Sequence, residues 1–217
     1  MSLTLYYHPL ASWCWKALIA LYETGAAFQP HLVDLGNETS RNEFLKVWPI
    51  GKFPVLRDEA RNQTVPEATV IIEYLQLFYP GPARFIPADV DSAWQTRLQD
   101  RFFDLHVHEH MQKVVLDRLR PAGNKDPMGV AHAKTMLQTA YGMLDRVMAS
   151  RQWAMGPEFT LADCAASPAL YYANRVQPFG SAYPKVAAYL ERLMKRPSFA
   201  RVLQEAQPYF SMFPEEK

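Results

Sequence analysis

The sequence contains only two cysteines, Cys14 and Cys164, among its 217 residues. Two cysteines so far apart do not resemble the dense cysteine framework of a small secreted domain, and they do not form a zinc-like cluster. A Cys-x-x-Cys pair is also missing, which argues against the dithiol redox chemistry of thioredoxins. These absences favour a reducing compartment and predict no bound metal.

An excess of one charge is missing as well, since 23 Lys and Arg residues are balanced by 22 Asp and Glu residues. A nucleic-acid-binding domain usually needs a basic face, so this balance argues against a nucleic-acid partner. No stretch approaches the roughly 18 uninterrupted apolar residues of a membrane-spanning helix. Residues 1–6 have neither the basic region nor the long apolar region of a signal peptide. We therefore expect a cytoplasmic protein that does not contact membranes.

Apolar residues make up 49% of the chain, enough for a sizeable core in one large domain or two small ones. The first part of the chain mixes strand and helix patterns, and Gly25 ends the first helix. The order βαβαββα is that of a thioredoxin-like α/β domain. The predicted strands are 3–7, 31–35, 55–56 and 63–65, and the predicted helices are 15–24, 43–47 and 67–79.

Strand patterns vanish in the second part of the chain. Pro80-Gly81-Pro82 stops the preceding helix, and residues 81–88 are predicted to be a linker. Amphipathic helical patterns follow, so we predict a thioredoxin-like domain at 1–80 and an all-α helical bundle at 89–217. The predicted helices of the bundle are 89–119, 130–150, one that starts near 160, 183–195 and 198–205.

Two segments of the first domain have the properties of a peptide-binding site. In 51–56 a proline precedes two strand-like residues, and a cis bond before Pro54 would present the backbone of Phe53 to a ligand. Glu67 and Ala68 place an acid and backbone N–H groups at a helix start, where anions bind. A bound extended peptide with a carboxylate end needs both features, a backbone to pair with and an anion site.

The loop between the first strand and the first helix is a usual place for ligand contacts in an α/β sheet. Ser12 lies there and is either a helix N-cap or a hydroxyl that faces a ligand. Cys14 follows it and is either a buried apolar side chain or a nucleophile.

The combination of Ser12, Phe53-Pro54 and Glu67-Ala68 resembles the cytosolic glutathione transferase family, and above all its bacterial, zeta- and theta-like members with a serine in the first loop. Thr160-x-x-Asp163 adds a capping box at the place where the family has one, with a structural role. The resemblance spans nearly the whole chain. It implies a homodimer and a glutathione co-substrate, with no metal.

The resemblance also implies roles for individual residues. Ser12 would hold the glutathione sulfur as thiolate, with Cys14 as the fallback. The backbone of Phe53 would pair with the cysteinyl part beside Pro54, and Lys52 would meet the glycyl carboxylate. Glu67 and the N–H of Ala68 would hold the γ-glutamyl end. The family usually has serine where this chain has Ala68, and Thr69 is the candidate replacement for the missing hydroxyl. The zeta-like pattern has a pair of serines in the first loop, and this chain has Ala11 in place of the first of them.

The electrophile is expected between Leu10, Trp13 and the long helix of the second domain. His106 and His110 share a face of that helix, but no third metal ligand is evident, so a solvated face or domain interface is the simpler interpretation. Arg175 follows Asp163 by twelve residues, as a substrate-carboxylate arginine does in zeta-class isomerases; the alternative is a surface or dimer-contact arginine.

The resulting hypothesis is an enzyme that joins glutathione to small apolar electrophiles or reduces peroxides with it. One alternative is a zeta-like, glutathione-dependent cis–trans isomerase, and the other is a non-catalytic binding module of the stringent-starvation type.

Overall fold

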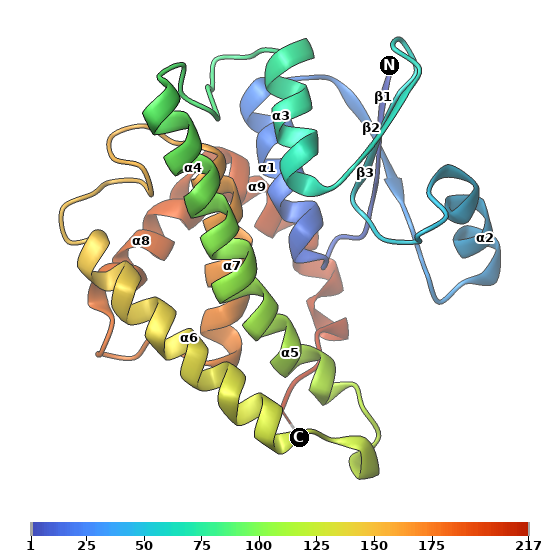
Figure 1. Cartoon of the computed structure of the whole chain (residues 1–217). Coiled ribbons are helices and arrows are strands. Elements are labelled where there is room, and N and C mark those ends of the chain that lie inside the picture. The colour runs from blue at the N-terminus through green and yellow to red at the C-terminus, as the bar shows by residue number, and fades with distance from the viewer. Residues whose placement is uncertain (1, 217) are drawn as a thin grey trace.

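A computed structural model describes residues 2–216 of the chain. Its first part contains a four-stranded mixed sheet with the strand order β2-β1-β3-β4. β1 pairs in parallel with β2 and antiparallel with β3, and β3 pairs antiparallel with β4 (Figure 1). The strands are β1 (Leu3–Tyr7), β2 (Phe28–Leu32), β3 (Val55–Asp58) and β4 (Gln63–Pro66).

Three helices complete this part in the order β1-α1-β2-α2-β3-β4-α3, which confirms the predicted thioredoxin-like arrangement. α1 (Ser12–Thr24) and α3 (Ala68–Phe78) lie side by side on one face of the sheet, and α2 (Glu38–Val47) lies on the other side (Figure 1). Gly25 ends α1 with φ 70°, the left-handed conformation that glycine adopts without strain.

The second strand was predicted at 31–35 and lies instead at Phe28–Leu32. The sequence pattern was misleading because this strand contains Pro30 and is largely exposed, whereas the apolar Val33 just beyond it is buried against Phe44. β2 is an edge strand, and an edge tolerates a proline because one side of its backbone makes no ladder bonds.

The second part is all-helical, as predicted. The expected helix 89–119 consists of α4 (Val90–Phe102), a π-helical segment η1 (Phe103–His108) and α5 (Glu109–Arg118). The capping box is present, because Thr160 and Asp163 each satisfy the other's backbone N–H at the start of α7. The remaining elements are η2 (Ala122–Asn124), α6 (Pro127–Val147), α7 (Leu161–Val176), α8 (Pro184–Lys195), α9 (Pro197–Ala206) and η3 (Gln207–Met212).

One continuous apolar core joins the two parts. Trp15 of α1 is fully buried, and its ring centroid lies 4.7 Å from that of Tyr172 in α7 and 6.0 Å from that of Phe199 in α9. The interface between the sheet and the helical bundle is therefore packed like a protein interior, which gives residues on its two sides fixed relative positions.

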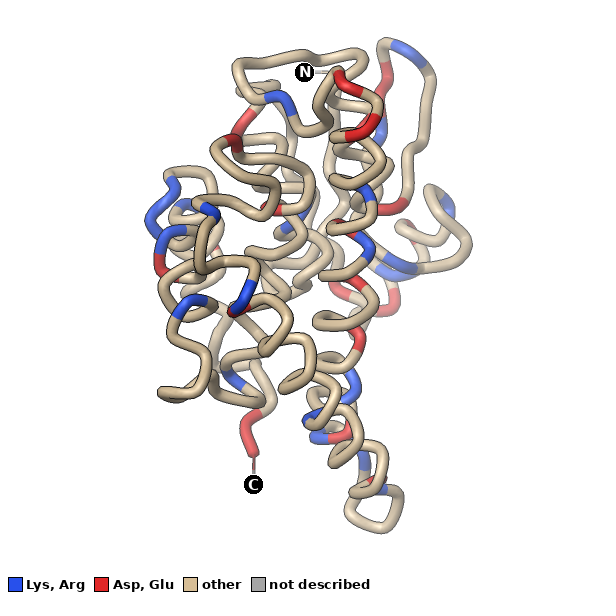
Figure 2. The backbone as a smooth tube through the Cα atoms, turned by 60° about the vertical axis from the view of Figure 1, so that its left-hand side comes forward, with Lys and Arg blue, Asp and Glu red and all other residues tan. Residues whose placement is uncertain are grey.

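The distribution of charged positions agrees with the balanced composition. Figure 2 shows Lys and Arg positions intermingled with Asp and Glu positions along the chain. Among residues 2–216, no helix is both long enough and apolar enough to span a bilayer.

Candidate functional site

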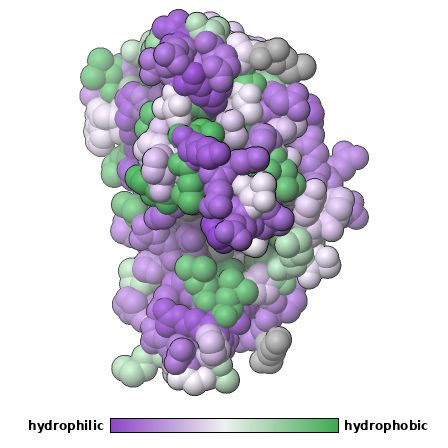
Figure 3. Space-filling view, turned by 90° about the vertical axis from the view of Figure 1, so that its right-hand side faces the viewer, coloured by the Kyte–Doolittle hydropathy of each residue, from purple (hydrophilic) through white to green (hydrophobic). Residues whose placement is uncertain are grey.

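A cleft of about 810 Å³ opens between the sheet and the helical bundle. Its walls come from the β1–α1 loop, the segment before β3, the start of α3, α5 and the residues around the end of η3. Figure 3 views the side on which α2 lies and shows a recess with an apolar patch below it. Most of the predicted site residues line this cleft: Leu10, Ser12, Trp13, Lys52, Phe53, Pro54, Glu67 and Ala68.

Ser12 is the first residue of α1, so its side chain lies at the positive end of the helix dipole. The N-cap position belongs to Ala11, which has extended backbone angles and makes no side-chain cap. Ser12 is therefore not the N-cap that its sequence position allowed. Its hydroxyl is instead hydrogen-bonded to Nε2 of His108, 96 residues away in the helical bundle.

His108 was not singled out by the sequence pattern, yet it is 2% exposed and its ring centroid lies 4.0 Å from the Trp13 ring. Burial lowers the pKa of His108 to about 3, and the nearby Lys16 charge acts in the same direction. The imidazole is therefore neutral at physiological pH, so Ser12 faces a neutral partner.

The π-helical segment η1 carries His108 to this position. π-Helical turns inside α-helices occur often at functional sites. Asp104 and His108 are one turn apart on η1 and contact Lys16 and Ser12, which are one turn apart on α1. The sequence signal for the Ser12–His108 pair is this shared spacing. His108 follows Asp104 by four residues, and Lys16 follows Ser12 by four residues.

Cys14 lies behind the cleft wall and is fully buried. Burial raises the pKa of its thiol, although a backbone hydrogen bond with His8 acts in the opposite direction. A nucleophilic cysteine needs a lowered pKa and access to its substrate. The surroundings of Cys14 are those of a small core residue.

The segment before β3 has the expected backbone, because the Phe53–Pro54 bond is cis. Phe53 and Pro54 line the cleft, and Lys52 is exposed at its rim. The ring of His8, from the loop after β1, stacks on Phe53 with a centroid distance of 6.1 Å. These residues form part of the cleft wall.

Glu67 precedes α3 and has φ 70° and ψ 118°, backbone angles that favour glycine. Its carboxylate does not cap the helix, and the residue lines the cleft with a strained backbone. Strain of this kind costs about 1–3 kcal/mol and is typical of ligand-binding positions.

This strain gives a test on stability alone. We expect Glu67→Gly to be about 1–2 kcal/mol more stable than Glu67→Ala, because only glycine adopts these angles without strain. Urea unfolding of both variants measures the difference, and the shared loss of the carboxylate makes each the control for the other. Equal stabilities would contradict a strained Glu67.

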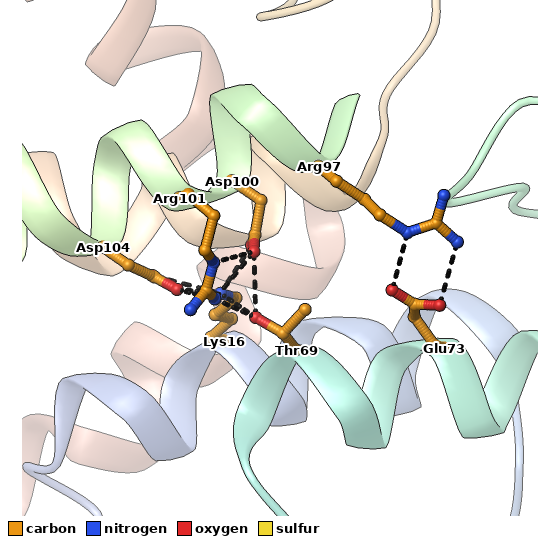
Figure 4. A network of polar contacts seen from close by, with 7 residues as sticks. All are labelled: Lys16, Thr69, Glu73, Arg97, Asp100, Arg101 and Asp104. Atoms are coloured by element: carbon orange, nitrogen blue, oxygen red, sulfur yellow. Dashed lines mark hydrogen bonds and ion pairs between the residues drawn. The ribbon is translucent and has the colours of Figure 1, made fainter. Parts of the chain in front are cut away.

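A buried ionic network links α1, α3 and the α4–η1 region beside the cleft (Figure 4). Nζ of Lys16 lies 2.5 Å from Asp100 and 2.8 Å from Asp104, and all three side chains are at most 3% exposed. Arg101 pairs with both carboxylates and also lines the cleft.

Thr69 is part of the same network. Its hydroxyl donates to Asp100 at 2.9 Å and accepts from Lys16 at 2.8 Å and from Arg101 at 2.5 Å. One donor and two acceptor positions are all that a threonine hydroxyl has. Thr69 therefore has no hydrogen-bonding capacity left to replace the hydroxyl missing at Ala68.

Arg175 does not line the cleft. Its guanidinium pairs with Glu215 at 3.1 Å and lies 4.8 Å from the centroid of the Phe213 ring. Phe213 does line the cleft, so Arg175 packs against a residue of its wall. Of the two expectations for this residue, a role in the pocket and a contact outside it, the geometry agrees better with the second.

Two family models match the chain: the N-terminal domain of glutathione S-transferases over residues 5–83 and their C-terminal domain over residues 105–197. A probable maleylacetoacetate isomerase from Caenorhabditis elegans is 27% identical over 208 residues, which are 94% of this chain and 94% of that protein. A stringent starvation protein A homolog from Histophilus somni is 25% identical over 211 residues, which are 95% of this chain and 92% of that protein.

Solved structures show the same fold. The glutathione transferase URE2P6 from Phanerochaete chrysosporium, crystallised with oxidized glutathione, superimposes with a TM-score of 0.84 at 23% sequence identity. The superposition covers 95% of this chain and 97% of that one, so the likeness includes both the sheet and the helical bundle.

Proposed function

Since the chain belongs to the cytosolic glutathione S-transferase family, we propose that it joins the thiolate of glutathione to small apolar electrophiles in the cleft. The observation that carries the proposal is the convergence of Ser12, the cis Phe53–Pro54 bond and Glu67 on one cleft. Together they supply a hydroxyl that can contact the sulfur, an extended backbone that can pair with a peptide and a carboxylate that can bind the γ-glutamyl ammonium.

In this proposal glutathione lies along the sheet side of the cleft. The backbone of Phe53 pairs with its cysteinyl residue, and Lys52 faces its glycyl carboxylate. Glu67 faces the γ-glutamyl ammonium, and the N–H of Ala68 at the start of α3 faces the neighbouring carboxylate. Arg101, which lines the cleft and donates to Thr69 near the start of α3, adds a positive charge for that carboxylate.

The sulfur then lies near Ser12 at the start of α1, where a hydroxyl donor and the helix dipole both favour a thiolate. A thiol pKa lowered by about 2 units from about 8.5 raises the thiolate fraction at pH 7 roughly 25-fold. Nucleophilicity falls with pKa, which offsets about tenfold of that gain. Most of the rate enhancement must therefore come from holding the electrophile against the sulfur.

The Ser12→Ala variant tests the role of the hydroxyl. We expect the pKa of the bound thiol to rise by about 1–2 units, while kcat/KM at pH 7 falls only about threefold, because activation contributes modestly. Thiolate absorbance against pH measures the first quantity, and calorimetry establishes that glutathione still binds.

Cys14→Ala is the matched control, because Cys14 lies two residues away but is buried and outside the cleft. We expect it to leave the thiol pKa unchanged. A changed thiol pKa in Cys14→Ala together with an unchanged one in Ser12→Ala would move the chemistry to the cysteine.

The Caenorhabditis elegans relative supports a second candidate function, glutathione-dependent cis–trans isomerisation. Its weak point here is Arg175, which pairs with Glu215 instead of lining the cleft. Turnover of maleylacetoacetate, followed by absorbance with and without glutathione, separates isomerase from transferase activity. The Histophilus somni relative makes a non-catalytic module the third candidate, and failure to bind glutathione resin would favour it.

We also propose that the protein is a homodimer through α3 and α4. Val70 and Leu77 of α3 are 51% and 70% exposed, and Trp94 and Leu98 of α4 are 52% and 55% exposed. The ion pair between Glu73 and Arg97 joins the two helices at this surface, so the apolar residues belong to one face of the molecule.

Light scattering at micromolar concentration should give twice the monomer mass for the wild type. Trp94→Glu should give a monomer, because a buried unpaired charge at the centre of an apolar interface is costly. Met128→Glu is the control, since Met128 is 84% exposed at the start of α6, away from α3 and α4. A monomeric wild type would contradict the proposal.

A further inference from the structure

The hydrogen bond between Ser12 and His108 leaves one question of chemistry open: which of the two side chains donates. Nε2 of His108 contacts the Ser12 hydroxyl, whereas Nδ1 of the same ring is buried and has no hydrogen-bond partner among residues 2–216. The neutral ring carries a single proton, on one nitrogen or the other. Its location decides what Ser12 can do.

If the proton were on Nδ1, a buried N–H would lack an acceptor, and Nε2 would accept the hydroxyl proton of Ser12. That proton would then point away from the cleft, so Ser12 could only accept a hydrogen bond from a ligand. If the proton is on Nε2, His108 donates to Ser12, and the unpaired Nδ1 is merely an acceptor. Buried N–H groups without a partner are rarer than under-satisfied acceptors, so the second arrangement is favoured.

The surroundings hold the ring in place for this task. Trp13 packs against the imidazole, and the Lys16–Asp104 ion pair fixes the same two helices one turn further along. The ring cannot become an imidazolium at physiological pH, because burial and the Lys16 charge both lower its pKa. His108 is thus a poor base for the Ser12 proton but a stable neutral donor.

We infer that His108 is a positioning residue for the proposed reaction: its Nε2–H donates to Ser12 and so directs the Ser12 hydroxyl proton towards the glutathione sulfur. The chain of donors runs from His108 through Ser12 to the thiolate. It crosses from the helical bundle to the sheet domain, so the thiol is activated only when the two parts are packed together. The inference rests on the proposed function.

The first test needs no glutathione. Long-range ¹H–¹⁵N correlation spectra distinguish the two neutral tautomers of a histidine, and His108→Gln identifies the His108 signals by their loss. We expect His108 to be protonated on Nε2 at neutral pH. A ring protonated on Nδ1 would overturn the inference whatever the protein catalyses.

The second test measures the pKa of the bound thiol in His108→Leu and His108→Gln. Leucine removes the donor, whereas the glutamine amide can donate from about the position of Nε2. We expect His108→Leu to raise the thiol pKa by about 1 unit, which is the effect of one hydrogen bond, and His108→Gln to keep most of the wild-type depression. An unchanged thiol pKa in folded, glutathione-binding His108→Leu would overturn the inference.

A double-mutant cycle separates positioning from a structural effect. In a Ser12→Ala background, His108→Leu should have no further effect on the thiol pKa, since the hydroxyl that it positions is gone. Equal effects in both backgrounds would contradict positioning. The other ionisable side chains of the cleft are the same in every variant, so differences between the curves come from positions 12 and 108; these side chains are His8, Lys52, Glu67, Arg101, Glu109 and Tyr172.

The two levels of the proposal fail in different ways. A wild type that does not bind glutathione overturns the proposed function, while the tautomer of His108 is still measured in the free protein. The positioning role alone is overturned if the wild type binds glutathione with a lowered thiol pKa and His108→Leu has the same thiol pKa as the wild type.

Discussion

Replacing Lys16 by methionine should reduce the free energy of unfolding by about 3–5 kcal/mol, because it leaves two buried carboxylates without their main counter-charge. Asp100 and Asp104 are 0% and 2% exposed, so water cannot take over the role of the ammonium. Methionine keeps most of the volume of the lysine chain, which limits the loss of packing. Arg101 still pairs with both carboxylates, which keeps the effect below complete unfolding.

The matched control connects the same two parts of the chain. Arg97 and Glu73 join α4 to α3 by two hydrogen bonds of 3.0 Å, but their side chains are 46% and 32% exposed (Figure 4). In the monomeric Trp94→Glu background we expect Arg97→Met to cost about 0–1 kcal/mol, because solvent there screens the exposed ion pair. Urea unfolding in that background, at one protein concentration, measures both variants. Similar losses would contradict a special role for the buried network.

The loss in Lys16→Met should also depend on pH. Burial raises the pKa of Asp104 in the folded protein, and the Lys16 charge opposes that rise. Without Lys16 the folded pKa rises further above the unfolded value, so the folded variant binds the proton more tightly. The stability that such a group contributes to the folded protein is lost as pH rises from the unfolded pKa, about 4, through the folded pKa. The variant should therefore lose least near pH 5 and most near pH 8.

Local patterns predicted most of the fold. Gly25, the Pro80-Gly81-Pro82 stop and the Thr160–Asp163 capping box act through backbone geometry within a few residues, so the sequence alone displays them. The same holds for the cis Phe53–Pro54 bond. The position of β2 was missed because a proline in an exposed edge strand does not have a strand pattern.

The partners of the site residues could not be predicted in this way. On α4 and η1 the usual arrangement holds only in part: Phe103 and Val107 are buried, but so are the polar Asp100, Asp104 and His108, which face α1, whereas the apolar Trp94 and Leu98 are exposed. A polar stripe on a helix normally predicts a solvated face. Only the packing of α1 against this stripe, through ion pairs and the Ser12 contact, identifies it as an interior surface.

Glu67 and Thr69 show the same limit on a smaller scale. The sequence places both at a helix start and leaves each available to a ligand. Glu67 adopts its positive φ without being glycine, and Thr69 uses its whole hydroxyl in the ionic network. The backbone strain of Glu67 and the full use of the Thr69 hydroxyl both depend on contacts with distant parts of the chain, so the local sequence does not show them.

Replacing Asp163 by alanine should cost about 3–5 kcal/mol, because its fully buried carboxylate accepts hydrogen bonds that have no substitute. One oxygen accepts from the N–H of Ala154 at 2.8 Å and from the Tyr189 hydroxyl at 2.5 Å. The other accepts from the N–H of Thr160 at 2.8 Å and from its hydroxyl at 3.1 Å. The residue therefore ties the start of α7 to α8 and to the preceding turn.

Asparagine at position 163 distinguishes this hub from simple space filling. It has the size of aspartate, but its amide has one acceptor oxygen, and its NH₂ would face two of the four donors. We expect Asp163→Asn to lose about 2–3 kcal/mol, close to the alanine variant. Asp145→Ala is the control, because Asp145 also accepts two backbone N–H groups, at the start of α8, but does so near solvent. The loss in Asp145→Ala should be smaller, since water replaces the carboxylate. If urea unfolding gave Asp163→Asn nearly the stability of the wild type, the size of the side chain, and not its four accepted hydrogen bonds, would hold α7 in place.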